Sequence, residues 1–383
     1  MSFDFDTLID RRGGDSNKWR KYPDDVLPMW VADMDFAVAQ AITTALQQRI
    51  AHPVFGYGLA RESLREVIVA DLAQRYGWTI APEDIVFLPG VEPGFNMALK
   101  AFVSPGDGVI VSTPVYRPML AAPAHWGLAR IDLPLQPGAD GVWRSAPAEL
   151  DAALAASRAI LLCNPHNPTG KVYTRAELQE VADGCLARDV LIISDEIHCD
   201  LTFDARTHIP IASLGSEVAA RTITLMAASK SYNIAGLKTA FAIVQNPQLR
   251  ERFIASKLGM VDSVNVMGLA ATEAAYEHGG PWKEALLAYL QANRDYLRAQ
   301  MAQRLPEIVM HAPESTFLAW LDCSALQLQP SPQAFFLEHA RVAFNPGDEF
   351  GAGYEQWVRL NFGCPRATLD EAIARLAASL GRA

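Results

Sequence analysis

Residues 160–170 read Ile-Leu-Leu-Cys-Asn-Pro-His-Asn-Pro-Thr-Gly, so a short apolar run passes directly into a polar loop. The run Ile160–Cys163 lacks the alternation of a half-exposed strand, which favours a strand buried on both faces of a sheet. The two Asn-Pro steps and the terminal glycine predict a rigid turn, from which asparagine side chains project as adaptable donors. Such a loop can be an ordinary connection, but a polar loop of seven residues at a strand end is more than a turn requires.

Apolar runs of the same kind recur along the chain and alternate with amphipathic segments. The predicted buried strands are Ile85–Leu88, Val109–Ser112, Ile160–Cys163, Val190–Ser194, Thr222–Met226 and Ala240–Val244. The segments 92–102, 175–187 and 247–258 have the amphipathic pattern of helices. This alternation predicts an α/β fold, with a mostly parallel sheet covered by helices on both faces.

The pattern changes after residue 281 to a smaller α+β arrangement. The predicted elements there are a polar helix over 282–304, strands near 317–322 and 357–362, and a closing helix over 367–381. Residues 1–35 have the pattern of an irregular arm that packs with this part. We therefore expect residues 1–48 to form the arm and the start of the small domain. Residues 49–280 should form the large domain, and residues 281–383 the small C-terminal domain.

Composition and charge exclude several classes of protein. The 383 residues are 50% hydrophobic and 20% charged, with a net charge of −10, so a large core is expected and a nucleic-acid partner is not. Residues 1–12 lack the pattern of a signal peptide, and no apolar run is long enough to span a membrane. The five scattered cysteines include no CxxC pair, which favours reduced, buried thiols in a cytoplasmic protein without a metal site.

Candidate chemical groups follow the ends of the predicted strands, where α/β sheets bind their ligands. Pro89–Pro93 opens a helix whose free N–H groups suit a phosphate, although most strand-to-helix turns contain glycine. Asp195 ends a hydrophobic strand, where it is either a helix cap or the partner of a positive group. Lys230 follows the strand Thr222–Met226 and is either a solvated surface charge or an imine-forming nucleophile of lowered pKa.

The order of these motifs resembles the fold-type I pyridoxal-phosphate enzymes of the aspartate aminotransferase superfamily, over almost the whole chain. Asp195 lies 28 residues after Asn167, and Lys230 lies 35 residues after Asp195. Within this superfamily, Met29–Phe36 (MWVADMDF) resembles the signature of the cystathionine β-lyase branch, the MalY/PatB-type C–S lyases. The segments Asp195–His198 and Arg359–Arg366 strengthen the narrower match. The resemblance implies a seven-stranded sheet and pyridoxal 5′-phosphate as cofactor.

The resemblance also implies residue roles. Lys230 would form the imine with the cofactor and abstract the substrate Cα proton, and Asp195 would pair with the pyridine nitrogen. Asn167 would donate to the phenolic oxygen, with His198 nearby, and Tyr116 would stack on the ring. The residues expected around the phosphate are Gly90, Val91, Glu92, Ser229, Lys238 and, from the neighbouring subunit, Tyr57. The residues expected to contact the substrate are Arg359, which would hold its α-carboxylate, and Trp30, Ala32 and Asn167.

Two positions depart from the pattern of this family. Many relatives have arginine where Lys238 stands, and a hydroxyl residue is common where Ala227 stands. A lysine supplies a positive charge but cannot form two parallel hydrogen bonds as arginine does, so backbone groups are expected to contribute more to phosphate binding.

The expected reaction is β-elimination from L-cystathionine or a related L-cysteine S-conjugate, which yields a thiol, pyruvate and ammonia. The resemblance further implies a homodimer with shared active sites. An aminotransferase is the nearest alternative, because it uses the same cofactor residues and differs in where the proton returns. A non-catalytic regulatory protein that retains the fold is an alternative of another class, and the intact Lys230 argues against it.

Overall fold

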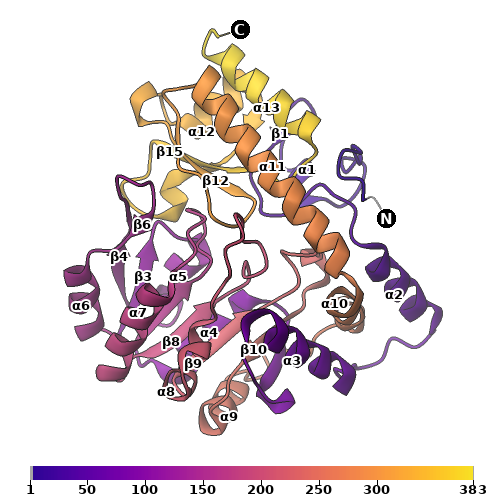
Figure 1. Cartoon of the computed structure of the whole chain (residues 1–383), viewed down its shortest axis with the longest axis vertical. Coiled ribbons are helices and arrows are strands. Elements are labelled where there is room, and N and C mark those ends of the chain that lie inside the picture. Colours follow the sequence, from indigo (N-terminus) through magenta and orange to yellow (C-terminus); the bar gives the residue numbers. More distant parts are fainter. Residues whose placement is uncertain (1–2, 383) are drawn as a thin grey trace.

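The computed structural model describes residues 3–382 and contains a central sheet of seven strands, in the order β2-β10-β9-β8-β7-β3-β4 (Figure 1). Six of these strands run in the same direction, and β10 is antiparallel to its neighbours β2 and β9. The bounds of the seven strands are β2 Ile85–Leu88, β3 Gly108–Thr113, β4 Ala129–Pro134, β7 Ala159–Cys163, β8 Leu191–Asp195, β9 Thr222–Met226 and β10 Ala240–Ile243.

The predicted mostly parallel, seven-stranded sheet is therefore confirmed, and each of the six predicted apolar runs forms one of its strands. The seventh strand, β4, lies at the edge of the sheet and was not predicted. Only Leu133 of its six residues is buried, so the strand has no continuous apolar run to reveal it.

Helices cover both faces of this sheet. On one face α4 (Val91–Phe102), α5 (Arg117–His125) and α9 (Pro247–Ala255) enclose a core with buried residues such as Phe95 and Phe253. The helices of the other face are α6 Pro147–Ala155, α7 Arg175–Ala187, α8 Ser216–Ala219, α3 Glu62–Tyr76 and α10 Val266–His278. The predicted helix 247–258 ends three residues early, at Ala255.

The C-terminal part contains an antiparallel sheet of four strands, ordered β11-β12-β15-β14, in the upper part of Figure 1. Its strands are β11 Val309–Met310, β12 Leu318–Asp322, β14 Asn345–Pro346 and β15 Trp357–Asn361. The helices beside it are α11 Gly280–Arg304, α12 Pro332–Phe335 and α13 Arg366–Ser379. The α+β character predicted for this part is confirmed.

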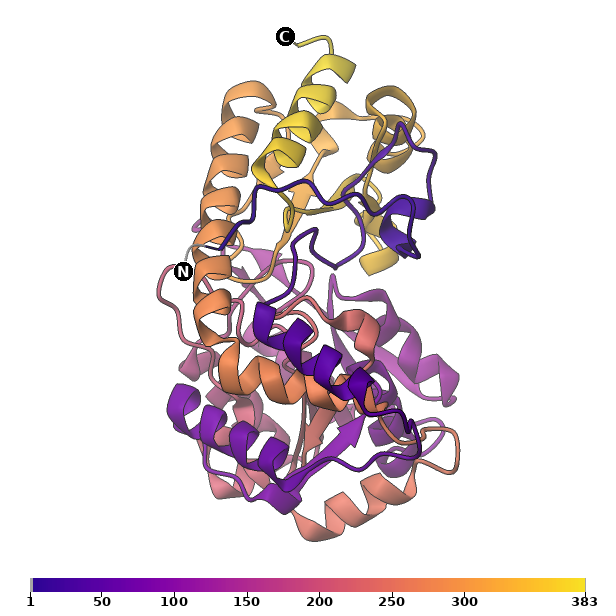
Figure 2. The same cartoon turned by 90° about the vertical axis from the view of Figure 1, so that its right-hand side faces the viewer.

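The N-terminal arm crosses this upper part of the molecule, as the indigo trace in Figure 2 shows. Its short elements are α1 Asn17–Arg20, β1 Leu27–Pro28 and α2 Gln40–Ala51, and a hairpin elsewhere joins β5 Gln136–Pro137 to β6 Trp143–Arg144. The strand β1 pairs in parallel with β13 (Val342–Ala343), so the two ends of the chain share one core. This contact brings the MWVADMDF segment to the carboxyl edge of the large sheet.

The five cysteines are free and buried, as predicted. Within residues 3–382, no helix is both long and apolar enough to cross a membrane.

Candidate active site

Five parallel strands of the large sheet end at the same edge, and the predicted chemical groups follow them there. These strands are β2, β3, β7, β8 and β9. A cavity of about 590 Å³ opens beyond these strand ends. The predicted site residues that line it are Ala32, Gly90, Val91, Glu92, Tyr116, Asn167, Asp195, His198, Ser229, Lys230 and Lys238. Eleven residues named from the sequence therefore meet at one cavity.

Hydrogen bonds within the loop 164–170 fix its conformation. His166 Nδ1 lies 2.9 Å from Thr169 Oγ1, and the Asn167 N–H donates to Cys163 Sγ at 3.5 Å. Gly170 has φ +71°, and a Cβ there would come within 2.3 Å of Pro313, so only glycine fits. The Tyr116 N–H donates to the Asn167 carbonyl at 3.1 Å, which couples the ring of Tyr116 to this loop.

The N-terminus of α4 forms one wall of the cavity. The helix begins at Val91, directly after Gly90, so the first N–H groups have no partner within the helix and suit an anion. Ser229 and Lys238 lie on the same cavity and add a hydroxyl and a positive charge. Lys238 adopts a left-handed backbone conformation, with φ 52°, which is rare for a residue with a side chain.

Lys230 lies in the cavity with its amine directed at the N-terminal arm. Its Nζ donates to the Ala32 carbonyl at 2.7 Å. Burial lowers the pKa of Lys230 to about 8, and the nearby Arg359 cation contributes to the same shift. The amine therefore has a larger neutral fraction near neutral pH than an exposed lysine, which favours its action as a nucleophile or base.

Asp195 is a buried carboxylate that forms no ion pair within residues 3–382. It accepts one hydrogen bond, from the Ile197 N–H at 3.1 Å, and burial raises the pKa of Asp195 to about 7. Burial lowers the pKa of His198 to about 3, with Lys230 contributing, so this imidazole is neutral. Its Nδ1 has no hydrogen-bond partner among the described residues. Both groups are thus left for a ligand.

The turn that carries Asp195 and His198 is supported by a buried pair of side chains, Glu196 and His208, which the sequence did not reveal. Glu196 Oε2 lies 2.6 Å from His208 Nε2, and its Oε1 accepts from Ser194 Oγ at 2.9 Å and from the Ile211 N–H at 3.2 Å. Both side chains are fully buried. Because Glu196 faces away from the cavity, its contacts fix the turn that carries Asp195 and His198.

Arg359, on β15, reaches the same region from the small sheet. It donates to Asn167 Oδ1 at 2.9 Å, to Asn345 Oδ1 at 2.7 Å and to the Trp30 carbonyl at 3.2 Å. Its Nε is buried and unpartnered among the described residues. Burial lowers the pKa of Arg359 to about 10, which still leaves it charged at neutral pH. The guanidinium is therefore held in place, and its Nε–H remains free to donate a hydrogen bond.

Three predicted residues are not part of the cavity lining: Arg359, which reaches it through Asn167, and Tyr57 and Trp30. The side chain of Tyr57 is fully exposed on the segment before α3, and the Trp30 indole donates to the Lys18 carbonyl, so Trp30 offers the site its backbone. The residues that were not predicted include Thr239, which lines the cavity, and Asn345, which orients Arg359. Thr239 could have been predicted from the sequence because it follows Lys238 directly. The contact of Asn345 with Arg359 could not, because it depends on the fold of the small sheet.

These residues fit pyridoxal phosphate. The cavity has a suitable size for a small ligand, and the α4 N-terminus, Ser229 and Lys238 can hold a phosphate. The unpaired Asp195 suits a protonated ring nitrogen, and Lys230 suits an aldehyde carbon. The carboxylate, the amine and the anion site surround the same space, as this cofactor requires.

Comparisons with known proteins agree with this fit. The family described as aminotransferase class I and II matches residues 24–376. The curated protein "Cystathionine beta-lyase PatB" from Bacillus subtilis (strain 168) is 37% identical, over 98% of this chain and 99% of that protein. The crystal structure of OvoB is 44% identical and superposes with a TM-score of 0.94, covering 99% of each chain.

The crystal structure of the PLP-bound C-S lyase from Staphylococcus hominis is 30% identical, with a TM-score of 0.92 over 99% of each chain. The family match and these near-complete alignments agree with the strand order and with the cavity. The protein therefore belongs to the class I and II aminotransferase family, with the type I fold of pyridoxal-phosphate enzymes, and within it to the cystathionine β-lyase branch.

Proposed function

We propose that this protein is a pyridoxal-phosphate-dependent C–S lyase, which cleaves L-cystathionine or a related L-cysteine S-conjugate into a thiol, pyruvate and ammonia. One observation carries the proposal: Lys230, Asp195 and Asn167 line one cavity, and Arg359 donates a hydrogen bond to Asn167 there. The similarity to PatB and to the C-S lyase from Staphylococcus hominis supports this reaction in particular.

The bound cofactor would supply a ring that takes up the negative charge developing at the substrate Cα. We propose that Asp195 holds the ring nitrogen protonated and that Asn167 donates to the phenolic oxygen, with His198 nearby. Tyr116 would cover one ring face. Gly90, Val91, Glu92, Ser229 and Lys238 would hold the phosphate, joined by Tyr57 of the neighbouring subunit.

Lys230 would carry the cofactor between turnovers and move the proton during each turnover. Once its amine is free, Nζ would take the proton from the substrate Cα. The electron pair left at Cα would form a Cα–Cβ double bond, and the Cβ–S bond would break with its electron pair on sulfur. A thiol has a pKa of about 8.5, so the thiolate leaves with little help from an acid. This property of the leaving group agrees with a neutral His198 in the site.

The substrate carboxylate would bind to Arg359. Charge-assisted hydrogen bonds from a guanidinium fix a carboxylate in one orientation, and Asn167 and Asn345 already hold the guanidinium in place. The Trp30 carbonyl accepts a hydrogen bond from Arg359, and Ala32 lines the cavity. These contacts would bind the amino-acid end of the substrate, which all L-cysteine conjugates share.

Thiol release tests the proposed function. The purified protein, supplied with pyridoxal phosphate and L-cystathionine, should release homocysteine continuously, as detected with a thiol-reactive dye. The Lys230→Ala variant serves as the control. Release by the wild-type protein that does not exceed this control would exclude the proposed activity on cystathionine.

Exchanging Arg359 for lysine should weaken substrate binding more than turnover. The lysine keeps the charge but loses the fork, so kcat/KM should fall about ten- to hundredfold, mainly through KM. Steady-state kinetics with L-cystathionine measure this split. Arg375→Lys, on the outer helix α13, should behave like the wild type, and an equal loss in both variants would contradict the role of Arg359.

Cofactor attachment should depend on pH through Lys230. The neutral amine is the nucleophile, and its pKa is lowered to about 8, so the rate should rise with pH and level off above about 8. Removing the neighbouring cation with Arg359→Leu should move this midpoint to higher pH. The visible absorbance after mixing the cofactor-free protein with pyridoxal phosphate follows the rate. A wild-type midpoint at about pH 10.4 is the value of an exposed lysine and would contradict the buried environment of Lys230.

We further propose that the protein is a cytoplasmic homodimer whose subunits share their active sites. The exposed side chains of Val54, Phe55, Tyr57 and Leu59 form an apolar segment that a second subunit could cover. Five free, buried cysteines suit a reducing compartment. Sedimentation equilibrium should give twice the mass of one chain, whereas a monomer at micromolar concentration would contradict the dimer.

The domain division is also a proposal. Residues 49–280 contain every strand of the large sheet, and α11 begins at Gly280. Residues 281–383 contain the four-stranded sheet, and residues 1–48 join them through the pairing of β1 with β13.

A further inference from the structure

Residues 30–36, called the strap here, run between the two halves of the molecule next to the proposed active site. The carbonyl groups of this short segment accept hydrogen bonds from side chains on both sides. Ala32 accepts from Lys230 at 2.7 Å, and Trp30 accepts from Arg359 at 3.2 Å. The position of the strap backbone therefore determines which hydrogen-bond acceptors Lys230 and Arg359 have.

Two asparagines hold the strap from opposite sides. Asn361, on β15, donates to the carbonyls of Val31 at 2.6 Å and Asp33 at 2.7 Å. Asn233, three residues after Lys230, donates to the carbonyls of Met34 and Phe36, both at 2.9 Å. Bonds of this kind need the strap in one register, since a shift by one residue would place other backbone groups opposite the two asparagines.

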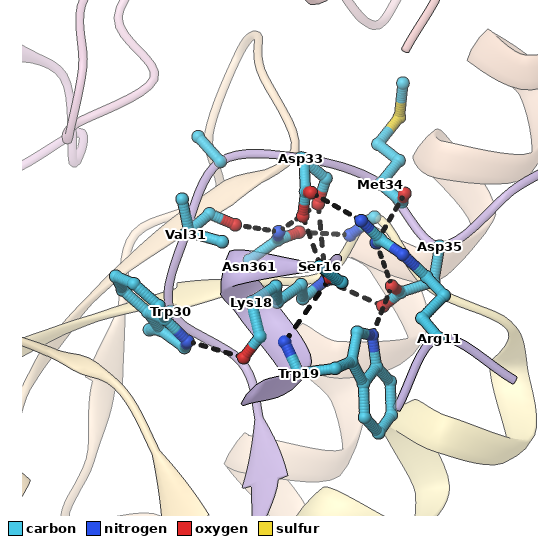
Figure 3. A network of polar contacts seen from close by, with 12 residues as sticks. Arg11, Ser16, Lys18, Trp19, Trp30, Val31, Asp33, Met34, Asp35 and Asn361 are labelled. Atoms are coloured by element: carbon cyan, nitrogen blue, oxygen red, sulfur yellow. Dashed lines mark hydrogen bonds and ion pairs between the residues drawn. The ribbon is translucent and has the colours of Figure 1, made fainter. Parts of the chain in front are cut away.

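A charged cluster from the arm holds the strap at its C-terminal end (Figure 3). Asp35 Oδ2 accepts from Lys18 Nζ at 2.7 Å, and its Oδ1 accepts from Arg11 at 2.6 Å and from the Trp19 indole at 2.8 Å. Arg11 also pairs with Asp33 at 2.7 Å. The Lys18 side chain is fully buried, and Asp35 is nearly so.

Such a cluster is costly to bury, and its charges are matched. Burial by itself would raise the pKa of Asp35, but Lys18, Trp19 and Arg11 bring this pKa below its ordinary value, so the carboxylate stays charged. A buried ion pair contributes little net stability compared with apolar packing, but removing one partner leaves the other charge buried and unpaired, which is strongly destabilising.

We propose that Asp35 is a positioning residue, which holds the strap in register so that the Ala32 and Trp30 carbonyls orient Lys230 and Arg359. This inference rests on the proposed roles of those two residues. When its amine is not bound to the cofactor, Lys230 has the Ala32 carbonyl as its acceptor, which keeps Nζ at one place. Loss of the cluster should therefore disturb proton transfer and carboxylate binding without removing any group that touches the substrate.

The test compares Asp35→Asn with Asp25→Asn in the holoenzyme. Asp25 lies on the same arm and pairs with Arg341 at the surface, where an ion pair has little effect on stability. Hydrogen exchange should become faster at residues 31–36 in Asp35→Asn alone. In that variant kcat/KM for L-cystathionine should fall at least about tenfold, because small displacements of reacting groups are costly. The pH titration of the visible absorbance of the bound cofactor should also shift by about half a unit or more.

Arg11→Gln provides a second variant, because Arg11 is partly exposed and its loss leaves Lys18 paired with Asp35. It should change all three readouts in the same direction by smaller amounts, and it keeps the test valid if Asp35→Asn does not fold. Faster exchange combined with kinetics and a titration like those of the wild type would overturn the proposal. If the wild-type protein releases no thiol, the proposed function fails, but the titration and the exchange still decide the role of Asp35.

Discussion

Lys230→Ala is expected to reduce thiol release about 10²- to 10⁴-fold, the range typical for the loss of a positioned base. The wild-type amine is buried, has a pKa of about 8 and lies at the cavity that the predicted cofactor residues share. Alanine removes both the covalent attachment of the cofactor and the acceptor for the Cα proton. The cavity itself should remain, because the wall formed by α4, Ser229 and Lys238 is intact.

The thiol assay under saturating cofactor measures this loss, with Lys100→Ala, an exposed lysine of α4, as the matched control. A small primary amine added to the assay should restore part of the activity of Lys230→Ala and none of it in a variant that lacks Asp195. Full activity of Lys230→Ala would show that another group takes the proton.

Asp195→Asn is expected to reduce thiol release about 10²-fold or more, although the side chain keeps its size. A neutral amide cannot hold a proton on the ring nitrogen by charge, and each unit of pKa lost there corresponds to about 1.4 kcal/mol. Thiol release measures the effect, with Asp183→Asn on the exposed face of α7 as the control. Activity within about twofold of the wild type would contradict the role of Asp195.

The same variant should stabilise the cofactor-free protein. Burial raises the pKa of Asp195 to about 7, so the folded state binds this proton more tightly than the unfolded state does. The free energy of unfolding therefore falls as pH rises from about 4 to about 7, and the loss persists above that range. The neutral amide of Asp195→Asn carries no such penalty, so the cofactor-free variant should melt at a higher temperature than the wild type at about pH 8.

The sequence predicted the large sheet well because most of its strands are buried on both faces and appear as continuous apolar runs. The edge strand β4 could not be found this way, since five of its six residues are at least partly exposed. The residues at the strand ends were predictable for a related reason. The carboxyl ends of parallel strands meet at one edge, so Asn167, Asp195 and Lys230 had to come close together.

Local sequence patterns could not predict the contacts between distant parts of the chain. The motif MWVADMDF was noticed in the sequence, but its links to Asn361 and Asn233 depend on how the arm crosses the C-terminal sheet. The buried Glu196–His208 pair and the contact of Asn345 with Arg359 are of the same kind. The predicted role of Tyr57 concerns a second subunit and stays a prediction.

The most direct test of C–S lyase activity is a single-turnover reaction of the holoenzyme with L-cystathionine, in which thiol, pyruvate and the state of the cofactor are measured together. We predict equal amounts of homocysteine and pyruvate, with the cofactor recovered as pyridoxal phosphate. Accumulation of pyridoxamine phosphate without any released thiol would contradict the lyase and identify an aminotransferase.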